Sequence, residues 1–378
     1  MDPTSKTTVL SYRPTEFVGA NRLAYFLLFL YIVTKPFYFF DSGSPQIADF
    51  IAVILFFIVF LSKGHISKSN AIIWSVYLIF CAYSVLISAL YFVSLGDPRT
   101  LKAGIFYTFN ALMLYVVLKL GEDNRKFIVA LMSFVVMSCV VQVIFSLAMQ
   151  SEFKREILFF NNPNQFAYWG LLSATIYCIC ARQIGVRIFV QILAWIVFSY
   201  LVLLGLSKAA TIALFVLAGI HFFRKPKHIF LFVVCAALLF VVAQGTEIVS
   251  NVSERLGNIG QQQDDSIMGR GYDRILDYPQ YLLFGAGEYA LERFPGVVHE
   301  IHSTVGTVIF SYGFVGTLIL GTFVWLLFRR VGLSQMLYAL PAFVYGGVHN
   351  GTRFTLLWML FGLIAITGVR KSEKKSNN

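Results

Sequence analysis

The sequence predicts an all-α membrane protein, and three observations carry this prediction. Hydrophobic residues make up 58% of the 378 residues and charged residues only 13%, whereas about 25% is usual in soluble domains. Apolar stretches of about 20 residues, the length that crosses a bilayer, recur along the whole chain. No stretch carries an ionisable residue near its centre. Because proton-driven pumps and many ion-coupled transporters need such residues as relays, this last observation disfavours them.

About twelve apolar stretches are expected to form transmembrane helices. They cover residues 22–40, 46–62, 71–93, 103–120, 127–149, 165–181, 187–206, 209–223, 228–244, 302–328, 333–348 and 353–369. The polar start runs directly into the first stretch without a small-residue cleavage site, which predicts an anchor and not a cleaved signal peptide. No internal repeat is visible, so one membrane domain over residues 1–378 is expected.

The largest connection between these stretches, residues 245–301, changes character along its length. It begins as a polar, linker-like sequence and continues as "RGYDRILDYPQYLLFGAGEYALERF". The second part mixes aromatic, apolar and charged residues, which predicts short helices lying at the membrane interface.

The charges indicate an orientation. With a cytoplasmic N-terminus and twelve crossings, 19 of the 30 Lys and Arg residues fall on the inner side, although the outer connections are much longer. This agrees with the preference of basic residues for cytoplasmic loops, and it predicts that both termini are cytoplasmic. The varied polar sequences "SEFKREILFFNNPNQ", 245–301 and "HNGTR" all fall outside. Function is therefore expected on the outer face.

Several familiar site motifs are absent. The chain has no "GxxxxGK[ST]", "HExxH" or "GxSxG" sequence and no acid-x-acid pair for a divalent metal. The five cysteines all lie within apolar stretches, where free cysteine behaves as a small hydrophobic residue. The sequence therefore predicts chemistry without a metal or a cofactor.

Candidate substrate-binding residues precede two of the apolar stretches. In "NNPNQFAYWGLL", Asn164 and Gln165 lie at the start of an expected helix, where their amides could bind sugar hydroxyls. Turn formation and helix capping by Asn164 explain the pattern equally well. Lys208 in "LLGLSKAATIAL" is a lone outer cation. It either binds phosphate or extends its ammonium group to the interface.

Arg270 and Arg274 in "GRGYDRILDY" are four residues apart, and they share one face if this segment is helical. Two guanidinium groups on one side suit a pyrophosphate, which arginine binds in bidentate fashion. A solvated helix with ion pairs to Asp273 or Asp277 explains the same spacing. The spacing leaves both interpretations open.

His302 lies where the tenth stretch begins, in "HEIHSTVGTVIFSYGFVGTLILG". Ser303 or Thr304 is expected to cap this helix. A histidine at a helix N-terminus is held in its neutral form by the helix dipole, which suits a general base. Packing at the interface is the alternative role of His302. The glycines Gly313 and Gly316 are expected to allow close helix packing.

His302 and Ser303, followed by nine residues and then "GFVGT", fit the H-[NSQ]-x9-G-x-x-G signature of bacterial O-antigen ligases and related transferases. Before the histidine the chain also has, in the order found in these proteins, "LSKAA", an outer "GR" segment and a "FGAGE" turn. The chain therefore resembles the O-antigen ligase and polymerase superfamily, most specifically over about residues 200–325.

The resemblance implies a glycosyltransferase of the bacterial inner membrane, with a fold similar to the type C class. Such enzymes work at the periplasmic face without metal or nucleotide sugar, and they transfer a glycan from undecaprenyl pyrophosphate to an acceptor hydroxyl with inversion. His302 takes the position of the base, Arg270 that of an outer-loop arginine, and Lys208 stands where the family usually has arginine. Arg274, Asn164, Gln165 and Ser303 complete the expected substrate-binding set.

Within the superfamily we expect a polymerase of O-antigen or another surface polysaccharide, because "IHSTVGTVIFSYGFVG" lacks the "HNxxL" style more usual in ligases. A ligase that attaches chains to lipid A core is the alternative, and a polysaccharide or lipid flippase is the alternative outside the class. Expected partners are an undecaprenyl-pyrophosphate-linked oligosaccharide, membrane lipid and, for a polymerase, a chain-length regulator protein, with no nucleic acid. Further candidates near His302 are His299, Glu300, His349, Asn350 and Arg353.

Overall fold

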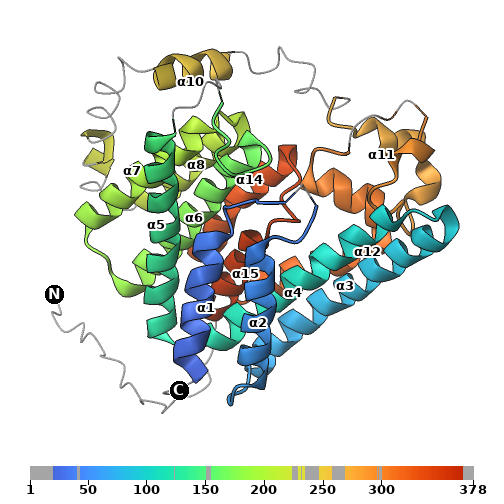
Figure 1. The fold of residues 1–378 in the computed structure, drawn as a ribbon, viewed down its shortest axis with the longest axis horizontal. Helices are drawn as coiled ribbons and strands as arrows, with labels where there is room; N and C mark the ends of the chain where they lie inside the picture. Colours follow the sequence, from blue (N-terminus) through green and yellow to red (C-terminus); the bar gives the residue numbers. More distant parts are fainter. Residues whose placement is uncertain are drawn as a thin grey trace, which may run out of the picture.

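The chain forms an assembly of helices (Figure 1). The computed structural model describes residues 20–40, 43–122, 124–149, 155–223, 229–230, 232–234, 247–257, 269–295, 297 and 300–368, and every regular element within them is helical. The longer helices are α1 (Ala20–Thr34), α2 (Ile47–Leu61), α3 (Lys68–Leu95), α4 (Lys102–Gly121), α5 (Arg125–Ala148), α6 (Pro163–Ile184), α7 (Ile188–Leu204), α8 (Lys208–Phe222), α10 (Glu247–Gly257), α12 (Thr304–Phe328), α14 (Leu340–Val348) and α15 (Thr355–Gly368).

Four helical stretches in the described part of the chain are long and apolar enough to cross a membrane. They are Lys68–Leu95, Pro98–Gly121, Arg125–Ala148 and Thr304–Phe328; the second consists of the short 3-10 helix η1 (Pro98–Leu101) followed by α4. Further apolar helices of 10–17 residues include α2, α7, α8 and α15. The chain is thus an all-helical protein with the helices of a membrane protein.

Most of the predicted stretches coincide with helices, and the differences have local causes. The first helix ends at Thr34, earlier than expected, because Pro36 disfavours helical geometry in the residue before it. The eleventh stretch is broken into α13 (Leu333–Met336), the 3-10 helix η5 (Leu337–Ala339) and α14, which has a proline in its first turn. Most of the ninth stretch, 228–244, lies outside the described residues.

Consecutive helices run between two ends of the assembly. At one end, residues in the connections expected outside, or at the ends of the apolar stretches beside them, contact each other: Tyr38 with Phe159, Arg155 with Gly205, Arg99 with Glu292, and Arg270 with Val348. At the other end, the connections expected inside do so: Ser67 with Glu122, Arg182 with Ser334, and Arg330 with Ser69. We call these the upper and the lower end, following Figure 1. Which end faces which side of a membrane stays a prediction from the sequence.

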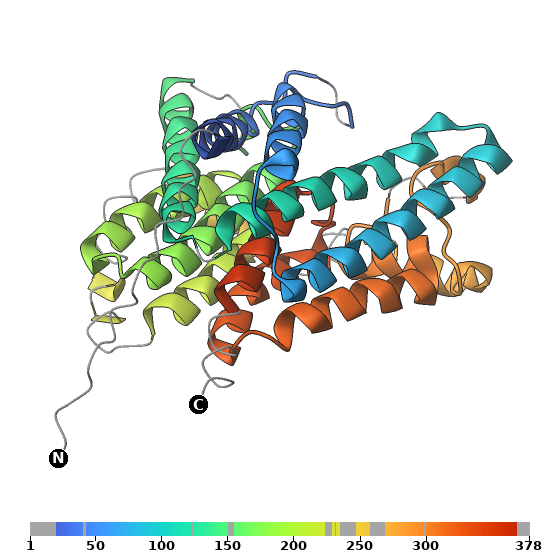
Figure 2. The ribbon, with the colours of Figure 1, turned by 90° about the horizontal axis from the view of Figure 1, so that it is seen from below.

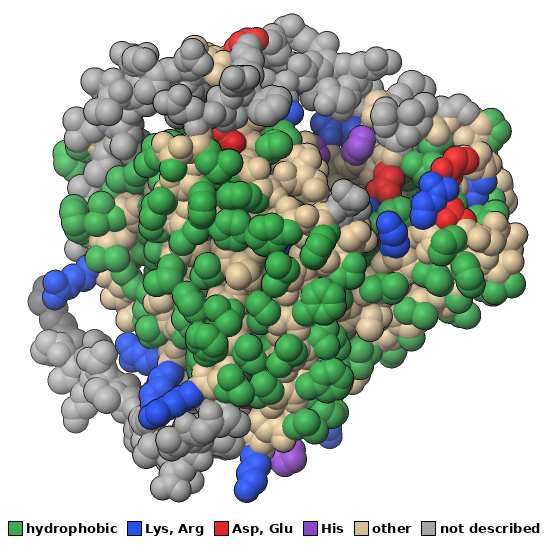
Figure 3. Space-filling model, in the orientation of Figure 1, with side chains coloured by type: hydrophobic (Ala, Val, Ile, Leu, Met, Phe, Trp, Pro, Cys, Tyr) green, Lys and Arg blue, Asp and Glu red, His purple; other side chains and the backbone are tan. Residues whose placement is uncertain are grey.

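Two helices, α6 and α15, are the most deeply buried part of a core to which most helices contribute. All 14 residues of α15 are buried, as are residues 166–181 of α6, and α15 packs against both α4 and α6. Peripheral helices instead expose large apolar side chains, such as Leu61, Val93 and Leu147. In the orientation of Figure 1, the molecule presents a broad apolar surface (Figure 3). Lys and Arg side chains are visible at the lower margin of this surface, and the visible acidic side chains lie towards the top. This distribution is typical of helices surrounded by lipid.

Helix α12 is broken at Gly313, and the break receives a loop. Gly313 has φ 62° and ψ −167°, a conformation that is essentially restricted to glycine. The carbonyls of Phe310 and Ser311 accept hydrogen bonds from the N–H groups of Ala286 and Gly287, both at 2.8 Å. Beyond the break, the N–H of Phe314 donates to the carbonyl of Leu282 at 2.7 Å. The "FGAGE" turn is therefore docked onto the backbone of α12, alongside α3 and α4 (Figure 2).

The described parts of the 245–301 connection contain more helix than expected. α10 occupies part of the segment predicted to be linker-like. The predicted short helices are present as α11 (Asp273–Asp277), η3 (Pro279–Tyr281) and η4 (Leu291–Arg293). They surround a small apolar cluster of their own, formed by Ala286, Phe294, Ile301 and Phe310. This cluster fixes the upper half of α12 beside the polar groups described next.

Candidate functional site

A group of basic side chains meets at the upper end of the assembly. Arg155 precedes α6, Arg270 lies in the turn before α11, His302 precedes α12, and His349 follows α14. We call these four residues the histidine cluster. Arg155, Arg270 and His302 each lie near enough to His349 to act on it electrostatically. Four connections far apart in the sequence thus converge at one place.

Backbone hydrogen bonds hold His302 next to Arg270. The N–H of His302 donates to the carbonyl of Arg270 at 3.1 Å, and the guanidinium of Arg270 donates to the carbonyl of Val348. The hydroxyl of Thr304 donates to the carbonyl of His349 at 3.2 Å. His302 is exposed. It can therefore meet a ligand that arrives from solvent or from the membrane surface.

Arg155 joins the start of α6 to the same group. One of its terminal nitrogens donates to Oδ1 of Asn164 at 3.1 Å, and the hydroxyl of Tyr345 donates to the carbonyl of Asn164 at 3.1 Å. The rings of Tyr345 and His349 lie 4.9 Å apart. Arg155 was not among the residues predicted from the sequence. Its position in the polar segment before Asn164 is the feature that could have indicated it.

The electrostatic environment keeps His349 neutral. Burial, followed by repulsion from Arg270, His302 and Arg155, lowers its pKa from 6.5 to about 4. Two arginines beside a neutral imidazole leave the cluster positively charged. Such a group is suited to bind an anion, and phosphate oxygens are the usual partners of arginine in this arrangement.

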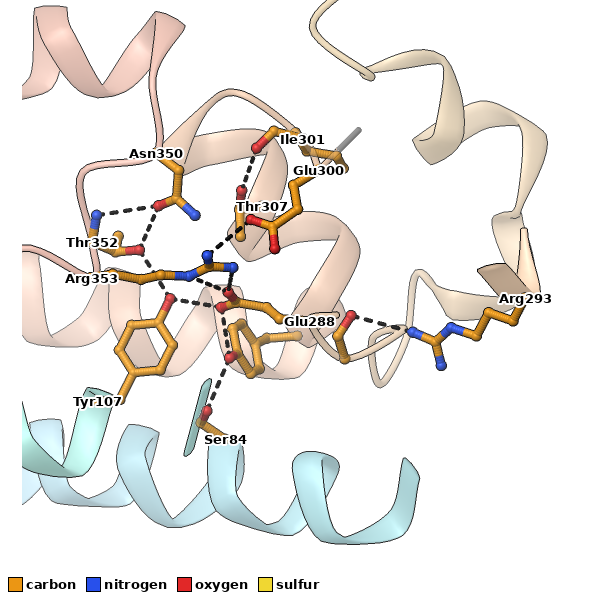
Figure 4. Close-up of polar contacts among 12 residues, drawn as sticks. Ser84, Tyr107, Glu288, Arg293, Glu300, Ile301, Thr307, Asn350, Thr352 and Arg353 are labelled. Atoms are coloured by element: carbon orange, nitrogen blue, oxygen red, sulfur yellow. Dashed lines mark hydrogen bonds and ion pairs between the residues drawn. The ribbon is translucent and has the colours of Figure 1, made fainter. Parts of the chain in front are cut away.

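A second polar group is centred on Glu288 at the end of the "FGAGE" turn (Figure 4). Oε1 of Glu288 accepts hydrogen bonds from the hydroxyls of Tyr107 and Tyr312 at 2.9 and 2.8 Å, and Oε2 accepts from Nε of Arg353 at 2.8 Å. Arg353 also pairs with Glu300, at 2.9 Å. We call Glu288, Arg353, Tyr107 and Tyr312 the Glu288 network.

The Glu288 network is extended by further hydroxyl groups. The hydroxyls of Thr352 and Tyr107 are 2.9 Å apart, and that of Thr352 donates to Asn350 at 2.7 Å. Ser84 of α3 donates to Tyr312 at 3.0 Å. Burial lowers the pKa of Arg353, but the attraction of the neighbouring carboxylates, Glu288 first, outweighs burial and raises that pKa well above its usual value. The guanidinium of Arg353 is therefore charged.

The same three segments contribute to the histidine cluster and to a pocket at the Glu288 network. Each segment has one residue in the histidine cluster and one at the pocket. In the turn and helix start around 270–274 these are Arg270 and Arg274, and before α12 they are His302 and Glu300. In the 349–354 connection they are His349 and Arg353. A small pocket, partly open to solvent, is lined by Arg274, Glu288, Glu300 and Arg353 among others. The positively charged cluster and this pocket are thus neighbours on shared backbone.

The structure corrects the prediction for the arginine pair. Helix α11 begins only at Asp273, and Gly271 turns the chain with φ 77°, so Arg270 and Arg274 do not share a helix face. Arg270 belongs to the histidine cluster. Arg274 is buried at 6% exposure and lines the pocket, where burial lowers its pKa.

Two predicted roles at helix starts also change. Asn162, not Asn164, caps α6 by accepting from the N–H of Gln165 at 2.9 Å. Ser303 is the predicted cap of α12 and accepts from Gly306 at 2.8 Å. Because Ser303 is fully buried and used in this way, it does not fit the expected role of binding substrate.

The remaining candidates lie at or near the same end. Lys208 is half-buried and begins α8, which packs against α6 and α14. Gln165 is half-buried, and its side-chain oxygen has no hydrogen-bond partner among the described residues. His299 lies outside the described residues. No group of three or more His, Cys, Asp or Glu residues in the described ranges is arranged to hold a metal ion.

Comparison with protein-family models and with curated protein sequences finds no match. The fold and the site together define an all-helical membrane protein with a positively charged group and a polar pocket at one end.

Proposed function

We propose that the chain is a membrane glycosyltransferase that takes a glycan from an undecaprenyl-pyrophosphate donor and transfers it to a sugar hydroxyl at the periplasmic face. The observation that carries the proposal is the convergence of Arg155, Arg270, His302 and His349 at the end expected to be outside. The proposal includes twelve transmembrane helices, a type C-like fold and a place in the bacterial inner membrane. The resemblance around His302 supports the class of reaction.

Each residue of the cluster has a role in this chemistry that suits its type. The acceptor oxygen attacks the anomeric carbon, the bond from that carbon to the pyrophosphate oxygen breaks, and the acceptor proton passes to the imidazole of His302. Arg155 and Arg270 offset the negative charge that develops on the departing pyrophosphate. Lys208 adds a further cation at the start of α8. No step needs a metal ion.

The favoured activity is polymerisation of a surface polysaccharide such as O-antigen. The test is complementation of a strain that lacks the gene, with His302→Asn and Arg270→Gln variants and gel analysis of lipopolysaccharide. We expect lipopolysaccharide with a single repeat from both variants. Lipopolysaccharide without any repeat would instead indicate the ligase.

The control variant is His65→Asn. His65 is exposed and follows α2 at the opposite, lower end of the assembly, so this variant should restore the full ladder. A full ladder from His302→Asn, at normal protein level, would contradict the enzyme and favour a flippase.

A further inference from the structure

Arg155, one of the two arginines of the histidine cluster, is held at the start of α6. One of its terminal nitrogens donates to Oδ1 of Asn164 at 3.1 Å. The same nitrogen and Nε both donate to the carbonyl of Gly205, at 3.4 Å. Gly205 directly follows α7, and carbonyl groups at the C-terminus of a helix attract cations. The guanidinium of Arg155 is therefore held between the start of α6 and the end of α7.

The backbone around this guanidinium is closely fitted together. The N–H of Glu156 donates to the carbonyl of Leu204 at 3.1 Å, which joins the segment before α6 to the end of α7. A Cβ atom added to Gly205 would lie 2.8 Å from the carbonyl oxygen of Pro163, in the first turn of α6. The three segments that carry or contact Arg155 are therefore in direct backbone contact with each other.

Asn164 is itself fixed by a contact from α14. The hydroxyl of Tyr345 donates to the backbone carbonyl of Asn164 at 3.1 Å. The ring of Tyr345 in turn stacks on the ring of Tyr168, with 3.8 Å between the ring centres. Arg155 acts electrostatically on both Tyr345 and His349, so its guanidinium lies near the end of α14. Asn164 therefore joins Arg155 to the helix that leads into His349.

The side chain of Asn164 has one oxygen, and Arg155 uses it. An asparagine side chain offers this oxygen as its acceptor and an NH2 group as its donor. Because Oδ1 accepts from the guanidinium of Arg155, it orients that group and is not free to accept from a sugar hydroxyl. A guanidinium is planar and binds phosphate in bidentate fashion, so its orientation decides how well it binds.

We propose that Asn164 is a positioning residue of the anion site: it orients the guanidinium of Arg155, and Arg155 contacts the phosphate groups of the ligand. The contribution of Asn164 to binding therefore passes through Arg155 and disappears when Arg155 is replaced. This inference rests on the proposed function only in so far as the histidine cluster binds pyrophosphate. It does not depend on the transfer step.

The test is a double-variant cycle on the affinity of the purified full-length protein for inorganic pyrophosphate, measured by titration calorimetry. The variants are Asn164→Ala, Arg155→Gln and the two together. Asn161→Ala is the matched control, because Asn161 lies in the same polar segment and is exposed. Thermal midpoints without ligand show that each variant is folded. If Asn164→Ala is not, Asn164→Ser takes its place, since it keeps a polar group at the start of α6 on a shorter side chain.

We expect Asn164→Ala to weaken pyrophosphate binding about fivefold, the effect of losing one ordinary hydrogen bond. Arg155→Gln should weaken it more, because the contact with phosphate itself is lost. In the Arg155→Gln protein, the further change Asn164→Ala should alter the affinity by less than about twofold. Asn161→Ala should match the wild type. A residue that only stabilised the start of α6 would instead weaken binding by the same factor with and without Arg155.

Three results would overturn the inference. The first is an unchanged affinity in Asn164→Ala, and the second is an equal loss with and without Arg155. The third is that pyrophosphate does not bind the wild-type protein, which would remove the anion site itself. Failure of the transfer reaction is seen separately. A full polysaccharide ladder from His302→Asn would contradict the enzyme and leave the coupling between Asn164 and Arg155 as measured.

Discussion

Gly285 and Gly313 lie backbone against backbone. A Cβ atom added to Gly313 would lie 2.7 Å from the nitrogen of Gly285, and one added to Gly285 would lie 2.4 Å from Cα of Tyr312. Both glycines have positive φ, of 95° and 62°. The contact docks the "FGAGE" turn onto α12 and so brings Glu288 to Tyr107 and Tyr312. Gly313, the first glycine of the H-S-x9-G-x-x-G pattern, is thus needed for the break in α12 and for the close approach of the "FGAGE" turn.

Gly313→Ala should therefore destabilise the fold strongly. The new methyl group would lie 2.5 Å from the carbonyl oxygen of Leu283, in a backbone conformation that alanine rarely adopts. We expect a loss of about 3 kcal/mol or more, measured as a lower thermal midpoint of the purified protein in detergent. Gly321→Ala in the same helix is the control, because nothing lies within 4 Å of its added Cβ. Equal midpoints for both variants would contradict the role of the break.

Glu288→Gln should unfold the protein at lower temperature, because it leaves the positive charge of Arg353 without its main partner. Breaking a buried ion pair from one side costs about 3–5 kcal/mol. The double variant Glu288→Gln/Arg353→Gln should lose less than the sum of the two single variants, since no unpaired charge remains. Strict additivity in this cycle would show that the two side chains do not interact.

The pH dependence of stability should report His349. Its pKa is about 4 in the folded protein and about 6.5 in the unfolded chain. Between these values the unfolded chain binds more protons, so stability falls as the pH is lowered from about 6.5 to about 4. The total change is at most about 3 kcal/mol. Thermal midpoints across this range should decline less in His349→Gln than in the wild type; parallel curves would rule out His349 as the source.

Arg155→Gln should weaken anion binding without a large effect on the fold. Inorganic pyrophosphate should raise the thermal midpoint of the wild-type protein, because a ligand that binds only the folded state stabilises it. The rise should be smaller in Arg155→Gln. Arg99→Gln provides the control, since Arg99 lies at the same end but pairs with Asp97 and Glu292 at the surface. A full rise in Arg155→Gln would exclude Arg155 from the anion site.

Much of the site could be predicted because polar residues between apolar stretches must lie near the ends of helices. His302, Arg270 and Asn164 were found in this way, and the structure places them at one end. The link of Arg155 to Asn164 and the separation of Arg270 from Arg274 could not be predicted. Both depend on how irregular segments turn, for which hydrophobic periodicity carries no information.

The sequence by itself determined that the protein is helical and apolar enough for a membrane, and it predicted most of its helices and the ends at which its polar residues gather. These follow from the composition, from the length of the apolar stretches and from the placement of basic residues, which are properties of the chain alone. Only the tertiary structure decided that Glu288 pairs with Arg353 and that three segments serve two neighbouring sites. Ion pairs between distant segments form where packing brings their charges together. In this chain the contact between Gly285 and Gly313 determines where Glu288 lies.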